Sequence, residues 1–190
     1  EVAAVLEENF LERGVRLLKG ARATSIDTTA DGVTVSCDDG RIVEGSYALL
    51  AIGSVPNSDG LGLENAGVET QWGYVEIDAD CRSSVPHIFA AGDLSGKLPL
   101  SSVASMQGRK IAETLMGRAT HGHNRVDYDK AASAIFTEPE IADVGLAEAD
   151  AFAMGRKVRV TKVPFTTSAK ALINDDPRGF IKLISDPATG

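Results

Sequence analysis

The sequence predicts an α/β chain whose last third changes to α+β. Two apolar runs, 48–52 and 87–91, each stop at a glycine, as buried strands of an open sheet do. A helix is expected from about Ser102 to Met116, closed by Gly117. After residue 126, short strand-like and helix-like runs alternate. They predict a small α+β part with an incomplete sheet.

The first 53 residues are expected to form one helix and a small antiparallel meander. Val2, Leu6 and Phe10 recur every four residues and give one apolar helix face, and Gly14 fits the position just past its end. VRLLKGARATSID, residues 15–27, is expected to provide a short strand and its continuation. The turn signals ADG and DDG flank VTVSC and predict two hairpins.

Residues 126–190 have the pattern of a different domain. AIFTEPEIADVGL is a strand-like run broken by Pro139, and AEADAFAMG predicts a short helix closed by Gly155. RKVRVTKVPF and RGFIKLIS alternate as half-buried strands should. The chain starts in helical sequence without Met and ends in the turn residues DPATG. We therefore expect a piece of a longer polypeptide.

Composition limits the possible functions. The chain has 190 residues, of which 43% are hydrophobic, and a formal net charge of −8. It can bury a real core, while the acidic balance argues against nucleic-acid binding. Without an apolar 18-residue run or a signal peptide, the expected location is cytoplasmic, with no membrane span. Cys37 and Cys81 form no redox-type pair, and His121 and His123 lack further ligands, so no metal site is predicted.

The pair Gly92-Asp93 gives the first functional hypothesis. An ionised carboxylate at the carboxyl edge of a sheet accepts hydrogen bonds from sugar or ribityl hydroxyls. The amides at the start of the next helix favour negative charge on a ligand, and Ser101 or Ser102 could cap them. The local pattern fits an ordinary strand end, turn and helix cap equally well. Gly53, after the first apolar run, likewise suits either a ligand contact or a plain turn.

Taken in order, these segments resemble the FAD- and NAD(P)-dependent pyridine nucleotide–disulfide oxidoreductases. That family includes dihydrolipoamide dehydrogenase, glutathione reductase and mercuric reductase. Residues 47–69 are similar to the strand after its NAD-binding meander, and residues 73–93 to its second FAD motif. Residues 134–151 are similar to the entry of its interface domain, and residues 178–190 to the strand and turn that follow. The resemblance covers essentially the whole chain.

The resemblance implies a division into three parts. Residues 1–53 would be the C-terminal half of the NAD(P)-binding domain, 54–125 the second segment of the FAD-binding domain, and 126–190 the start of a homodimerising interface domain. The implied FAD contacts are Gly92, Asp93, Pro99, Leu100, Ser101 and Ser102, with Asp93 on the ribityl chain. The implied NAD(P) contacts are Gly53, beside the nicotinamide nucleotide, and Ala23, near the adenine end.

The resemblance also implies an activity. The parent protein would pass hydride from NAD(P)H through FAD to a disulfide or a quinone. No catalytic residue is expected in this chain, because the family's redox CxxxxC, its two GxGxxG motifs and its His-Glu pair are not in it. LSSVA, residues 100–104, stands where dihydrolipoamide dehydrogenases read LAHKA, and it is similar to the actinobacterial NAD(P)H–quinone reductases. RGFIKL resembles mercuric reductase.

Two alternatives remain open at this point. The chain on its own could be an inactive piece that contributes part of an FAD site and part of a dimer interface. It could also be a non-catalytic binding or assembly module.

Overall fold

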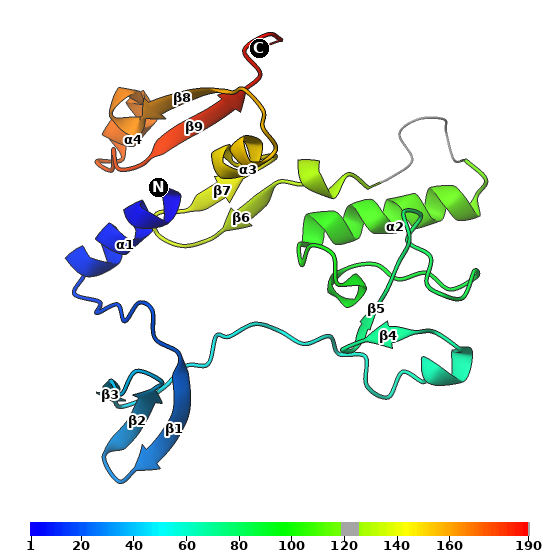
Figure 1. Ribbon diagram of the computed structural model, residues 1–190, viewed down its shortest axis with the longest axis horizontal. Helices are drawn as coiled ribbons and strands as arrows, with labels where there is room; N and C mark the ends of the chain where they lie inside the picture. Colours follow the sequence, from blue (N-terminus) through cyan, green and yellow to red (C-terminus); the bar gives the residue numbers. More distant parts are fainter. Residues whose placement is uncertain (119–125, 190) are drawn as a thin grey trace. The chain divides into compact units, whose positions relative to one another are not determined.

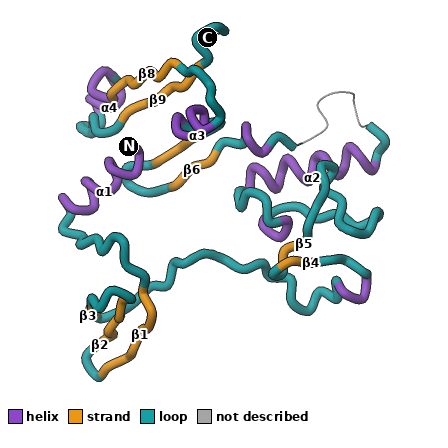
Figure 2. The backbone as a smooth tube through the Cα atoms, viewed as in Figure 1, coloured by secondary structure: helices purple, strands orange, loops and turns teal. Residues whose placement is uncertain are grey.

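The computed structural model describes residues 1–118 and 126–189 and divides into two compact units, 1–54 and 55–190. Figures 1 and 2 show their helices and strands. The first unit contains helix α1 and three strands, whose bounds are α1 Val2–Glu12, β1 Ala23–Thr29, β2 Gly32–Cys37 and β3 Ile42–Gly45. The strands pair in the order β1-β2-β3, all antiparallel. The predicted meander is confirmed.

The predicted helix ends are also confirmed, and they share one geometry. In α1, the Gly14 N–H donates to the carbonyl of Leu11 at 3.0 Å, and the Val15 N–H donates to that of Phe10 at 2.9 Å. These two bonds satisfy carbonyls that the helix leaves without partners. Gly117 and Gly155 end α2 (Ser101–Leu115) and α3 (Glu148–Ala153) in the same way.

The second unit is built around a small apolar core. Its first strands, β4 (Thr70–Gln71) and β5 (Tyr74–Val75), form a two-stranded sheet. Its buried core residues are Val68, Val75, Ile77, Cys81 and Ala90, with Leu94 and Ile111 packed against them. Helix α2 buries the face that carries Val103, Gln107 and Lys110, which recur at helical spacing. The core thus joins α2 to the segment that precedes it.

The C-terminal part contains two hairpin-like pairs and two short helices. The strands are β6 Ser133–Ile135, β7 Ile141–Asp143, β8 Arg159–Pro164 and β9 Phe180–Ser185, paired antiparallel as β6–β7 and β8–β9. Helix α4 (Ala169–Ile173), which we did not predict, begins at Ser168, whose side chain accepts from the Ala171 N–H. Every residue of β8 is exposed, so the expectation of a half-buried β8 is wrong.

Both apolar runs that predicted buried strands have a different structure. Residues 48–52 form no strand, and Leu49 and Ile52 are 91% and 89% exposed. In the second run, Phe89 makes only an isolated bridge to Arg82. The strand expected in residues 15–27 forms only from Ala23 onward, as β1, and of residues 73–84 only Tyr74–Val75 lies in a named strand. A strand inside an open sheet needs hydrogen-bonding neighbours on both sides. Among the described residues, 48–52 have none and 87–91 have one on a single side, residues 81–83.

Candidate cofactor site

The Gly92-Asp93 turn has a backbone that depends on glycine. Gly92 has φ 79° and ψ −159°, a region that residues with a side chain almost never occupy. The Ser95 N–H donates to the Gly92 carbonyl at 2.9 Å, and the Gly96 N–H donates to that of Asp93 at 3.1 Å. A Cβ at Gly92 would lie 3.5 Å from the Ala104 Cβ. The turn therefore lies against the first turns of α2.

Side chains hold both backbone groups of Gly92. Its N–H donates to Oε1 of Gln107 at 2.6 Å, and its carbonyl accepts from Oγ of Ser95 at 2.7 Å. Nε2 of Gln107 donates to Ser95 Oγ at 3.1 Å and to the Tyr128 hydroxyl at 3.0 Å. The residue before Asp93 is thus fixed from two sides.

The Asp93 carboxylate itself is available to a ligand. Asp93 is exposed, and its side chain makes no hydrogen bond or ion pair with any residue of the described ranges. An ionised carboxylate is an acceptor only. A hydroxyl group of a ligand is therefore a suitable partner for it.

The start of α2 differs from the prediction in one respect. Its cap position is Leu100, and no side chain bonds the first amides, so the prediction that Ser101 or Ser102 caps the helix is wrong. Both serines lie exposed in the first turn, because the helix begins one residue earlier than expected. The uncapped amides remain available to an anionic group. Pro99, just before the helix, is also exposed.

Ala23 and Gly53 are the residues predicted to contact NAD(P), and no hydrogen bond among the described residues joins them. Ala23 is the exposed first residue of β1 and faces Cys37 on β2. Gly53 has φ 116° and open space where a Cβ would stand. It is exposed because residues 48–52, which would lead into it as a strand, have no sheet around them.

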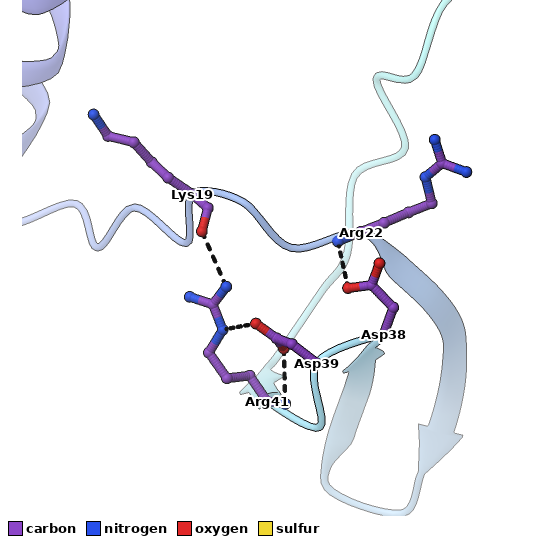
Figure 3. Close-up of polar contacts among 5 residues, drawn as sticks. All are labelled: Lys19, Arg22, Asp38, Asp39 and Arg41. Atoms are coloured by element: carbon purple, nitrogen blue, oxygen red, sulfur yellow. Dashed lines mark hydrogen bonds and ion pairs between the residues drawn. The ribbon is translucent and has the colours of Figure 1, made fainter.

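The first unit contains a charged turn whose bonds we did not predict. Figure 3 shows Nε of Arg41 donating to Asp39 at 2.5 Å, while its Nη2 donates to the Lys19 carbonyl at 3.0 Å. The Arg22 N–H donates to Oδ1 of Asp38 at 3.0 Å. Hydrogen bonds from the backbone N–H and then the side chain of Arg41 lower the pKa of Asp39. A groove of about 890 Å³ beside this turn is lined by Arg16, Leu18, Arg41, Ile42, Val43 and Glu44.

The sequence reasoning missed three residues of the network that holds Gly92: Gln107, Ser95 and Tyr128. One signal could have pointed to Gln107. It lies four residues after Val103 and three before Lys110, a helical spacing that places it on the buried face of α2. A buried amide needs partners, so its position indicated a polar network. No sequence pattern identified Tyr128 as one of those partners.

Cys81 is fully buried, which leads to a prediction about thiol reactivity. Burial, followed by the charge of Asp78, raises the pKa of its thiol, against a lowering by Lys110. A raised pKa means that the thiol form stabilises the fold below the ordinary thiol pKa and that this contribution declines at higher pH. At pH 8 we expect a thiol reagent to modify half-buried Cys37 at least about tenfold faster than Cys81. Denaturant should equalise the two rates, and equal rates in the folded protein would contradict the burial.

No group of three or more metal-ligating side chains occurs in residues 1–118 and 126–189. His121 and His123 lie outside the described residues. Within the same ranges, no helix is both long enough and apolar enough to cross a membrane.

Comparison with known proteins decides the family. Residues 1–108 match the pyridine nucleotide-disulphide oxidoreductase family, and residues 131–190 match its dimerisation domain. The chain belongs to the pyridine nucleotide-disulphide oxidoreductase family. The expected fold and the resemblance seen in the sequence are therefore confirmed.

Relatives within the family extend well beyond this chain. An NAD(P)H dehydrogenase (quinone) of Mycobacterium tuberculosis is 44% identical over the whole chain, which covers 38% of that protein. A dihydrolipoyl dehydrogenase of Staphylococcus aureus is 36% identical over 95% of the chain and 38% of its own length. The crystal structure of LpdA from M. tuberculosis superposes with a TM-score of 0.89 at 44% identity, over all of this chain and 41% of that one. The chain thus spans about two fifths of the relatives it matches.

Proposed function

We propose that this chain is part of an FAD-dependent oxidoreductase that moves hydride from NAD(P)H through the flavin to an acceptor. One observation carries the proposal: an unpartnered Asp93 carboxylate on a glycine turn that Gln107 and Ser95 hold in place. The family membership supports the reaction class.

The residues of the turn suit the middle of an FAD molecule. Asp93 would accept a hydrogen bond from a ribityl hydroxyl, and Gly92 would keep the backbone free of a side chain at that point. Pro99, Leu100, Ser101 and Ser102 would lie along the flavin. The bound flavin supplies the hydride and electron chemistry, while the protein binds and orients it. The uncapped amides of α2 would favour negative charge on the ring edge.

The nicotinamide nucleotide would be held in part by the first unit. Gly53 offers a backbone without a side chain in open space, and Ala23 is exposed at the start of β1. With these contacts, residues 1–53 belong to the NAD(P)-binding domain, 54–125 to the FAD-binding domain and 126–190 to the interface domain. Each assignment is part of the proposal.

A quinone is the acceptor that the comparisons favour. The M. tuberculosis NAD(P)H dehydrogenase (quinone) shares 44% identity with the chain, against 36% for the S. aureus dihydrolipoyl dehydrogenase. The serines at the start of α2 agree with this choice. We expect the purified full-length protein to carry flavin absorbance and to oxidise NADH or NADPH with a quinone at least about tenfold faster than with lipoamide, a difference of ~1.4 kcal/mol in activation free energy.

Two outcomes of the same experiment would contradict parts of the proposal. A folded, colourless protein that takes up no added FAD would overturn the proposed function. A flavoprotein that prefers lipoamide would keep the flavin site and replace the acceptor by a disulfide.

Two further parts of the proposal concern assembly and location. Residues 131–190 match a dimerisation domain, so we propose a homodimer, which sedimentation of the full-length protein would measure. Cys37 and Cys81 are both free thiols. Free thiols are typical of a reducing compartment, and they support the proposed cytoplasmic location.

A second candidate concerns the chain by itself. It spans about two fifths of its relatives, which favours an inactive piece that supplies only part of an FAD site and of a dimer interface. Titrating the isolated chain with FAD and NADH separates the two possibilities. Tight FAD binding together with NADH oxidation would exclude the inactive piece.

A further inference from the structure

Gln107 is the polar side chain around which the turn is organised. It is 0% exposed and lies in the middle of α2. Both the oxygen and the nitrogen of its side-chain amide are hydrogen-bonded. Oε1 accepts from the Gly92 N–H, and Nε2 donates to the hydroxyl groups of Ser95 and Tyr128. A buried amide with complete hydrogen bonding is rigid, whereas one with a missing partner is costly.

The direction of each proton in this network follows from the partners. The Gly92 N–H can only donate, so the oxygen of the Gln107 amide must face it. The Ser95 hydroxyl gives its proton to the Gly92 carbonyl, which leaves its oxygen to accept from Nε2 of Gln107. The Tyr128 oxygen accepts the second N–H of that amide. Rotating the amide by half a turn would place N–H against N–H at Gly92.

We propose that Gln107 is a positioning residue of the flavin site, and that the Tyr128 hydroxyl fixes the orientation of its amide. The inference rests on the proposed role of Asp93 in binding FAD. Asp93 directly follows the residue whose N–H and carbonyl this network holds. Tyr128 lies 21 residues after Gln107, three residues before the match to the dimerisation domain begins. The bond from Gln107 therefore links the entry of that domain to the Asp93 turn.

Loss of the Tyr128 hydroxyl leaves one buried N–H of Gln107 without a partner. The amide then gains freedom to turn, and the Gly92 N–H loses its fixed acceptor. The carboxylate of Asp93 consequently samples more positions, and its bond to a ribityl hydroxyl weakens. Loss of the Gln107 amide removes the acceptor of the Gly92 N–H altogether, together with the bonds to Ser95 and Tyr128.

The test measures the FAD dissociation constant of the full-length protein by the change in flavin fluorescence on binding, alongside the melting temperature of the FAD-free form. We expect Gln107→Leu, which removes three hydrogen bonds, to weaken FAD binding about tenfold and Tyr128→Phe, which removes one of them, about three- to tenfold. The double variant should bind about as weakly as Gln107→Leu alone, because the two residues act through one amide.

Two further variants separate positioning from plain stability. Val68→Ala leaves a cavity in the apolar core, where Val68 is buried, and should lower the melting temperature while leaving FAD affinity within about twofold, since Val68 lies outside the network. Gln107→Glu should bind FAD best at low pH, where its protonated carboxyl can both accept from Gly92 and donate onward, and should lose affinity as that carboxyl ionises. Wild-type binding should not show this pH dependence.

Unchanged FAD affinity in Gln107→Leu and Tyr128→Phe would overturn the inference. Losses of FAD affinity in Gln107→Leu and Tyr128→Phe that are no larger than the loss in Val68→Ala for the same drop in melting temperature would overturn it as well. Asp93→Asn, measured in parallel, identifies which idea has failed. If Asp93→Asn also binds FAD like the wild type, the proposed role of Asp93 is wrong; if it alone loses affinity, only the positioning role of Gln107 is wrong.

Discussion

Replacing Asp93 by asparagine is expected to weaken FAD binding by the full-length protein about 10- to 100-fold. A hydrogen bond to a charged group contributes about 1.5–3 kcal/mol, and the exposed carboxylate has no other partner among the described residues. The substitution keeps the size of the side chain and replaces one acceptor oxygen by a donor. Isothermal titration of the FAD-free protein with FAD would measure the change.

Asp59→Asn is the matched control for this experiment. Asp59 is also exposed and lies in the same unit, in a turn that precedes the core. The chemical change and the loss of charge are identical, so a general electrostatic effect would affect both variants. Equal FAD affinity in the two variants would show that Asp93 does not bind the cofactor.

Gly92→Ala is expected to destabilise the protein by about 1–3 kcal/mol and to release FAD. The cost comes from the backbone, since φ 79° and ψ −159° are nearly closed to a residue with a Cβ. It does not come from crowding, because the new Cβ would meet the Ala104 Cβ at an ordinary 3.5 Å. Denaturant unfolding of the FAD-free protein and its FAD affinity would measure the two effects.

Gly108→Ala makes the same chemical change in the neighbouring helix. Gly108 lies inside α2, and nothing stands within 4 Å of the place where its Cβ would be. Alanine in a helix interior is more stable than glycine by about 0.5–1 kcal/mol. The two variants should therefore shift stability in opposite directions. A Gly92→Ala protein as stable as the wild type would contradict the described turn.

The elements predicted correctly from the sequence are those whose hydrogen bonds are local. The end of helix α2 at Gly117 was predicted from one glycine, and the two bonds that close the helix join residues only three and five positions apart. The meander of β1 to β3 follows from two turn signals between neighbouring strands. In both cases the segment contains its own partners.

The wrong predictions of buried strands depended on distant partners. An apolar run such as 48–52 forms a strand only if other strands flank it, and the sequence of the run itself does not show whether such neighbours exist. At the proposed site, Asp93 was predicted because its neighbours in sequence resemble a family motif. Gln107 and Tyr128 were not, because their bond joins positions 21 residues apart and leaves no local pattern.

The exposed stretch that begins at Tyr47 has a practical consequence. Residues 47–52 read YALLAI, six residues without charge, proline or glycine, and Tyr47, Leu49 and Ile52 are about nine-tenths exposed. Such segments pair edge to edge between molecules and start aggregates. Work on the isolated chain therefore needs dilute, monodisperse samples, and a charged residue at Leu49 offers a way to obtain them without touching the Asp93 turn.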